Sequence, residues 1–178
     1  MRRVAGLLAG VAVGLGGLMV AGAGAQGRES VPSYETPNAP GSITMPASIS
    51  TPPAAPERRS HAQLEALWRE AGAAYGVPWQ VLGAINVVES NLGQNMGPSY
   101  AGAVGWMQFL PSTWERWGMD GDADGLADPW DPEDAVYSAA RYLAATGAHE
   151  DLRRAVFAYN HSNAYVDKVL SLAQKLGG

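Results

Sequence analysis

One glutamate lies within an apolar helical pattern near the middle of the chain. Residues 77–91 read VPWQVLGAINVVESN, with apolar residues at helical spacing and Pro78 in the position that suits a first helical turn. Glu89 follows Leu82 by seven residues and Ile85 by four, so it lies on or beside the apolar stripe. Because burial disfavours the charged form of a carboxyl, we expect a raised pKa and a proton donor near neutral pH. The alternative is a structural glutamate at the rim of the core.

An amide among aromatic rings follows this glutamate. Residues 99–114 read SYAGAVGWMQFLPSTW, in which Gln108 stands between Trp106 and Phe109. The glycines Gly102 and Gly105 permit tight turns and close backbone approach. Sugars are bound through amide or hydroxyl hydrogen bonds and through apolar faces packed on rings, so this composition suits a saccharide cleft. The alternative is that the rings belong to the core and that the amide is solvated.

Acidic residues are concentrated in one loop. Residues 120–131 read DGDADGLADPWD, which places Asp120, Asp122 and Asp124 at positions 1, 3 and 5 and a glycine at position 6, as in an EF-hand calcium loop. Position 12 holds Asp131, where a longer glutamate is usual, and Asp131 is also expected to cap the next helix. Plain Asp-Gly turns are the alternative.

The elements that must position these residues are all helical. Ser60 and Gln63 predict a capping box at the start of the domain, and Gly76 predicts the end of that helix. No segment shows convincing strand alternation, so we expect one compact all-α domain over residues 60–178. Further helices are expected from Pro78, from Pro111, from Asp131 to about Thr146, over about Glu150–Tyr159, and from Ser162 or Asn163 to Leu176.

Two segments precede this domain. Arg2 and Arg3, an apolar run and Ala-Gly-Ala at 23–25 predict a signal peptide over residues 1–25. Glycines at four-residue spacing leave an uncleaved membrane anchor as the alternative, and in both cases the domain is exported. Residues 26–59 contain seven prolines and few large apolar residues, which predicts a disordered linker.

Composition excludes several classes of protein. The chain has no cysteine, so it forms no disulfide and no thiolate metal site. From Ser60 onward there are seven basic and fourteen acidic residues, a net charge of −7. A domain that acidic is a poor nucleic-acid binder.

Four segments in order resemble one family of enzymes. They are Glu89-Ser90, the stretch SYAGAVGWMQFLPSTW, the run DPWDPEDAVYSAARYL from Asp128, and AYN at 158–160. Together they resemble the catalytic domain of lytic transglycosylases of the membrane-bound type B branch, over about Glu65 to Leu176. The resemblance implies a lysozyme-like fold.

The resemblance implies cleavage of the β-1,4 bond between N-acetylmuramic acid and N-acetylglucosamine in peptidoglycan, leaving a 1,6-anhydromuramoyl end without water. Glu89 matches the single catalytic acid/base of the family. Two-carboxylate glycosidases place their acids about 5–10 Å apart, whereas the nearest acids in this sequence are Glu70 and Glu115. A lone acid fits chemistry assisted by the acetamido group of the substrate.

The resemblance also implies binding residues. Ser99, Gln108, Tyr159, Asn160 and Tyr165 match substrate-contacting positions, and we expect Tyr159 to hold the Glu89 carboxyl by a hydrogen bond. Alternatives are a structural partner for the Tyr159 hydroxyl and a helix-capping role for Asn160.

For the acidic loop, the type B branch implies a structural Ca²⁺ whose closing carboxylate lies fifteen residues in. The expected ligands are Asp120, Asp122, Asp124, the Leu126 carbonyl and Asp134. The expected partner is peptidoglycan glycan strands, bound by a monomer that touches a membrane only through an uncleaved N-terminal segment. A muramidase that uses water and a non-catalytic wall-binding module are the alternative functions.

Overall fold

The computed structural model describes residue 49, residues 51–55 and residues 57–178. The predicted signal peptide and most of the predicted linker lie outside the described residues. Six helices form the described part, and the one non-helical pairing in it is an isolated bridge between Val104 and Phe109. The helices are α1 (His61–Tyr75), α2 (Trp79–Ser90), α3 (Pro111–Trp117), α4 (Pro132–Ala145), α5 (Leu152–Asn160) and α6 (Asn163–Gly177). The predicted all-α fold is confirmed.

Local sequence signals place most helix ends. Ser60 and Gln63 form the predicted capping box, and Gly76 ends α1 in the left-handed conformation at φ 62°. Asp131 caps α4 by accepting the Asp134 N–H. The prediction for α5 was wrong by two residues at its start, because Asp151 is the capping residue and accepts the Arg154 N–H.

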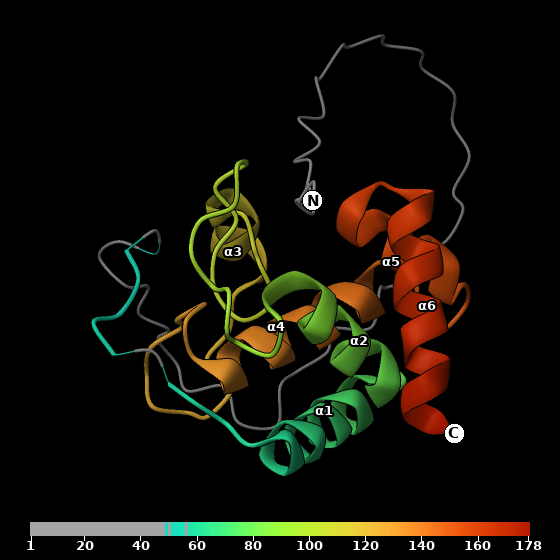
Figure 1. Cartoon of the computed structure of the whole chain (residues 1–178), viewed down its shortest axis with the longest axis horizontal. Coiled ribbons are helices and arrows are strands. Elements are labelled where there is room, and N and C mark those ends of the chain that lie inside the picture. Colours follow the sequence, from blue (N-terminus) through green and yellow to red (C-terminus); the bar gives the residue numbers. More distant parts are fainter. Residues whose placement is uncertain (1–48, 50, 56) are drawn as a thin grey trace, which may run out of the picture.

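The helices pack around one apolar core. The most extensive contacts join α2 to α6 and to α1, and α1 also packs on α4. In Figure 1, α4 passes behind α2, while α3 lies with the loops on the side away from α6. The largest buried side chains include Trp68, Trp106, Trp114 and Tyr159. Helices α1, α4 and α6 therefore pack against α2, whose last turn carries Glu89.

Contacts of the folded domain begin before Ser60. Arg59 forms ion pairs of 2.7 Å with Glu57 and 2.8 Å with Glu133. The indole N–H of Trp130 donates to the Ile49 carbonyl at 3.0 Å. The end of the predicted linker thus touches the start of α4.

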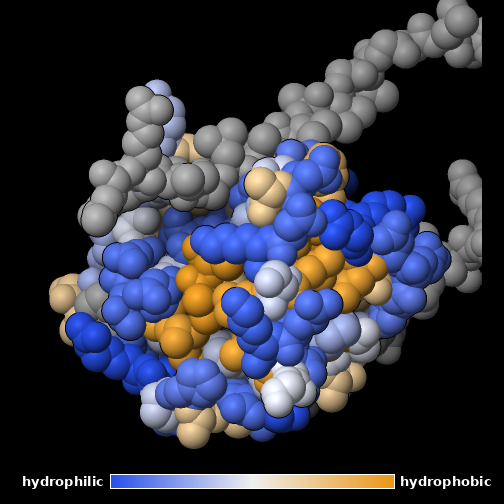
Figure 2. Space-filling view, turned by 45° about the vertical axis from the view of Figure 1, so that its right-hand side comes forward, coloured by the Kyte–Doolittle hydropathy of each residue, from blue (hydrophilic) through white to orange (hydrophobic). Residues whose placement is uncertain are grey.

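Not all apolar surface is covered. In Figure 2, apolar side chains stay visible in the middle of the face shown, with hydrophilic side chains around and across them. Such mixed surface suits ligands that are partly apolar and partly polar. Within the described residues, no helix combines the length and apolar content needed to cross a bilayer.

Candidate active site

Glu89 is half-buried in the last turn of α2 and has one specific hydrogen-bond donor. The buried Tyr165 of α6 donates its hydroxyl to Glu89 Oε1 at 2.6 Å. Burial raises the pKa of Glu89 from 4.5 to about 7, against the opposing effects of the Tyr165 hydrogen bond and the Lys168 charge. The predicted rise in pKa is confirmed. At neutral pH this group is divided between a proton donor and a proton acceptor.

The predicted hydrogen bond from Tyr159 to Glu89 is wrong. Tyr159 is fully buried at the end of α5, and its hydroxyl donates to the Met107 carbonyl at 3.0 Å. Tyr159 still lies close enough to Glu89 for the two groups to interact electrostatically. Burial, together with the charge of Glu89, raises the pKa of Tyr159 well above 10. Tyr159 therefore holds the backbone at Met107, and Tyr165 makes the contact with Glu89.

Gln108 lies in a tight loop between the paired residues Val104 and Phe109. The backbone groups of these two residues exchange hydrogen bonds of 2.9 and 3.0 Å. Gln108 adopts a left-handed φ of 51°, and its side-chain amide donates to the Met96 and Gly105 carbonyls, both at 3.2 Å. The Gln108 amide nitrogen therefore stabilises the loop itself.

A buried polar network that the sequence did not reveal joins this loop to α2. Asn86 and Ser90 both donate to the Trp106 carbonyl, at 2.9 and 2.7 Å. The Ser90 hydroxyl also accepts the Gly93 N–H at 3.0 Å. The network flanks Glu89 on its own helix, so it fixes the end of α2 against the Gln108 loop. The i, i+4 spacing of the two polar residues in an apolar helix was the available signal.

Of two further predicted binding residues, Ser99 is engaged by the backbone and Asn160 is not, among the residues that the structure describes. The hydroxyl of Ser99 accepts the N–H groups of Ala101 and Ala103, at 3.2 and 3.0 Å. Asn160 ends α5, but the helix cap is His161, so the capping alternative is wrong. The Asn160 amide nitrogen is buried and has no hydrogen-bond partner in the described part of the chain.

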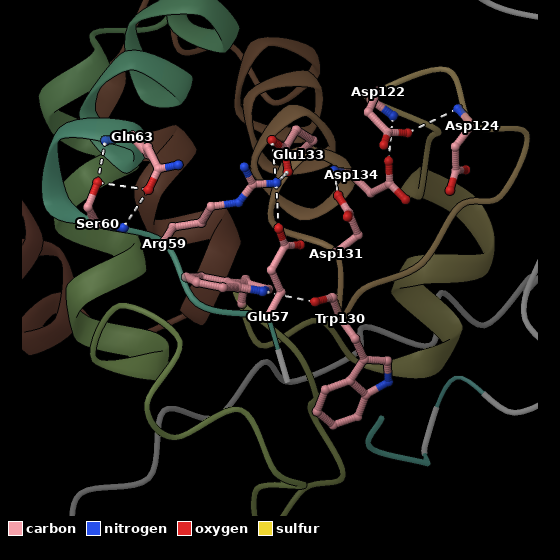
Figure 3. A network of polar contacts seen from close by, with 12 residues as sticks. Glu57, Arg59, Ser60, Gln63, Asp122, Asp124, Trp130, Asp131, Glu133 and Asp134 are labelled. Atoms are coloured by element: carbon pink, nitrogen blue, oxygen red, sulfur yellow. Dashed lines mark hydrogen bonds and ion pairs between the residues drawn. The ribbon is translucent and has the colours of Figure 1, made fainter. Parts of the chain in front are cut away.

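The acidic loop gathers carboxylates beside the start of α4. Oxygen atoms of Asp120, Asp122 and Asp134 lie within 4.8 Å of one another, as a single cation would require. Asp124 lies outside this group, and its carboxylate accepts the Leu126 N–H at 2.8 Å. Figure 3 shows Asp122, Asp124 and Asp134 on one side of the start of α4 and the Arg59 ion pairs on the other.

The carboxylates of Asp120, Asp122 and Asp134 lie close enough to repel one another. Burial, together with the nearby Asp131 and Asp122 charges, raises the pKa of Asp134 to about 8, although two backbone N–H groups oppose the rise. A divalent cation among these oxygens would offset both burial and repulsion.

Trp106 connects the acidic loop to the Glu89 helix. Its backbone N–H donates to the Pro129 carbonyl at 3.1 Å, and its indole N–H donates to the Trp130 carbonyl at 2.8 Å. A Cβ on Gly105 would lie 1.9 Å from the Pro129 oxygen, and the Gly105 φ is +80°. Only glycine permits this approach.

The fold is that of the lysozyme-like lytic transglycosylases, as comparison with solved structures shows. The lytic transglycosylase SLT35 of Escherichia coli, solved in complex with calcium, matches with a TM-score of 0.60 and 20% identity, covering 65% of this chain and 71% of that one. SltB3 of Pseudomonas aeruginosa, solved with NAG-NAM-pentapeptide, matches with a TM-score of 0.61 and 22% identity, covering 66% and 61%.

Sequence comparison gives the same family resemblance. Residues 94–156 match the family described as Transglycosylase SLT domain. The chain is 43% identical over 53 residues to membrane-bound lytic murein transglycosylase B of Escherichia coli strain K12. That alignment spans 30% of this chain and 15% of the relative. The family match begins after Glu89, so the assignment of Glu89 depends on the site geometry.

Proposed function

We propose that this protein is a peptidoglycan lytic transglycosylase and that Glu89 is its single general acid and base. The observation that carries the proposal is the half-buried Glu89 carboxyl, with a pKa of about 7 and a 2.6 Å hydrogen bond from Tyr165. A group with that pKa both donates and accepts a proton near neutral pH.

The relatives support the substrate class. SltB3 has been solved with NAG-NAM-pentapeptide and also with NAG-anhNAM-pentapeptide, a ligand with an anhydro sugar. We extend this substrate class to the present chain, with the bond between N-acetylmuramic acid and N-acetylglucosamine as the one cleaved.

The reaction needs two proton transfers at one carboxyl. Protonated Glu89 gives its proton to the bridging oxygen as the bond from C1 of the muramic acid breaks. The acetamido group of the same sugar stabilises the cation that forms. The C6 hydroxyl then bonds to C1 and returns its proton to Glu89, so no water is consumed. The Tyr165 hydroxyl holds Oε1, which leaves the second carboxyl oxygen for the substrate.

The surroundings of Glu89 favour one-acid chemistry over a pair of carboxylates. Among the described groups that perturb its pKa, the charged one is Lys168, and none is a carboxylate. A two-carboxylate glycosidase would place a second acid within about 10 Å. This favours chemistry assisted by the acetamido group of the substrate over a mechanism with a carboxylate nucleophile, and the masses of the products distinguish attack by the C6 hydroxyl from attack by water.

The remaining predicted residues have supporting roles in this proposal. Tyr165 holds the acid, and Tyr159 supports the loop beneath it through the Met107 carbonyl. Gln108, Asn160 and Ser99 border the glycan in this proposal. The Gln108 side-chain oxygen, the Ser99 hydroxyl proton and the Asn160 amide nitrogen, unpartnered within the described residues, orient acetamido and hydroxyl groups.

We further propose that the acidic loop holds one structural Ca²⁺. The donors that fit best are Asp120, Asp122 and Asp134, whose carboxylate oxygens already converge. Asp124 and the Leu126 carbonyl complete the predicted set. The calcium complex of SLT35 supports the choice of ion. Bound calcium would fix the loop that contacts Trp106 and would take no part in proton transfer.

The site of action follows from the substrate. Peptidoglycan lies outside the cytoplasm, so the proposed activity requires export, in agreement with the predicted signal peptide or anchor. We propose that the protein acts as a monomer.

The test is digestion of purified peptidoglycan followed by mass spectrometry of the products. We expect muropeptides lighter by one water than those a hydrolase releases. Glu89→Gln should abolish release while leaving strand binding intact, and Glu115→Gln, at an exposed position of α3, is the matched control. Hydrated products would assign the muramidase reaction, and bound but uncleaved strands would assign a binding module.

A further inference from the structure

Most cations of this acidic domain are already engaged. Of its seven basic residues, three form ion pairs: Arg69 with Glu65, Arg153 with Asp167 and Arg154 with Glu150. A fourth, Arg141, lies over the Trp117 ring at 5.6 Å.

Lys168 differs from these four because it is unpaired and lies at the catalytic acid. It is exposed on α6 and forms no ion pair within the part of the chain that the structure describes. It follows Tyr165 by three residues, so the two side chains are neighbours on the helix surface. Tyr165 contacts Glu89 directly at 2.6 Å. The Lys168 charge acts on Glu89, because it lowers the pKa of that carboxyl.

An exposed ammonium at this place can bind an anionic group of the substrate. The domain carries a net charge of −7, which opposes the approach of any polyanion. Peptidoglycan carries carboxylates on the lactyl ether of peptide-free muramic acid and on the stem peptides. Chitin has a similar β-1,4 amino-sugar backbone without carboxylates. One exposed ammonium beside the reacting bond would distinguish these polymers.

We propose that Lys168 is a specificity-determining residue that binds a carboxylate of the peptidoglycan strand next to Glu89. The inference rests on the proposed function and adds the anionic selectivity of the same site. It predicts that Lys168 contributes to the binding affinity for anionic strands and makes no contribution to the affinity for neutral strands.

The experiment measures binding in a Glu89→Gln background, in which strands stay intact. Lys168→Gln is added, and Lys175→Gln, at another exposed lysine of α6, is the matched control. The probes are peptide-bearing strands, peptide-free strands, and both preparations after their carboxylates are converted to methylamides. We expect Lys168→Gln to raise Kd about two- to fivefold on an anionic preparation, the range that one exposed ion pair supports. We expect no change on the methylamides.

The two unmodified preparations identify the source of the carboxylate. A rise on peptide-free strands assigns the lactyl group, and a rise confined to peptide-bearing strands assigns the stem peptide. Equal Kd values for both lysine variants, or an equal rise on the methylamides, would overturn the inference. Failure of the proposed function has a different signature, since wild-type protein would then bind these strands without releasing product.

Discussion

Replacing Glu89 by glutamine should stabilise the protein at alkaline pH while removing its activity. In the folded state the pKa of Glu89 is about 7, compared with an ordinary value of 4.5. The folded state therefore retains a proton between these two pH values that the unfolded chain releases. Stability from this group is complete below about pH 4.5 and is lost as the pH rises through about 7. Glutamine is neutral at every pH and can still accept the Tyr165 hydrogen bond.

The magnitude follows from the two pKa values. A difference between about 7 and 4.5 corresponds to about 3 kcal/mol of unfolding free energy above pH 8. That is a substantial fraction of the 5–15 kcal/mol typical of a domain. The acidic loop also titrates in this range, but its contribution is common to both proteins and cancels in their difference.

Urea unfolding at pH 4.5 and pH 8.5 measures the effect. The stability difference between Glu89→Gln and wild type should become more favourable to the variant by about 3 kcal/mol between the two conditions. Glu115→Gln, at an exposed position, should show no comparable change. A difference that is the same at both pH values would refute the claim that Glu89 is destabilised by its charge.

Three other results are expected. Tyr165→Phe removes the 2.6 Å donor to Glu89, so kcat should fall and the basic limb of the pH–rate profile should move up by about one pH unit; an unmoved limb would contradict the assignment. Gly105→Ala should lower the unfolding free energy by about 2 kcal/mol or more, whereas Gly97→Ala, where an added Cβ meets nothing within 4 Å, should be close to neutral. Chelation should lower the Tm and calcium should restore it. At a free calcium concentration a hundred times Kd, binding should add about 2.7 kcal/mol to the unfolding free energy. Asp134→Asn should abolish this response, and a Tm indifferent to calcium in wild type would reject the ion.

The sequence predicted those features that depend on neighbouring residues. Ser60 with Gln63, and Asp131 before a proline, are local capping signals, and both caps form. The raised pKa of Glu89 also followed from local information, because helical spacing placed the carboxyl beside an apolar stripe.

Features that depend on how the helices pack against one another could not be predicted from the sequence. Tyr159 and Tyr165 lie on either side of the junction between α5 and α6, and only the packing of α6 on α2 decides which one reaches Glu89. The bonds from Asn86 and Ser90 to the Trp106 carbonyl join residues 16 to 20 positions apart. The i, i+4 spacing of the two polar residues indicates a buried network but does not identify Trp106 as its partner.

Trp106 connects the acidic loop to the last turn of α2, which carries Glu89. The same residue donates to Pro129 and Trp130 on one side and accepts from Asn86 and Ser90 on the other. Local opening at either end would leave buried partners of this residue unsatisfied, so the two regions open together. Calcium bound in the acidic loop would thereby also reduce the conformational fluctuations of Glu89, at the end of α2.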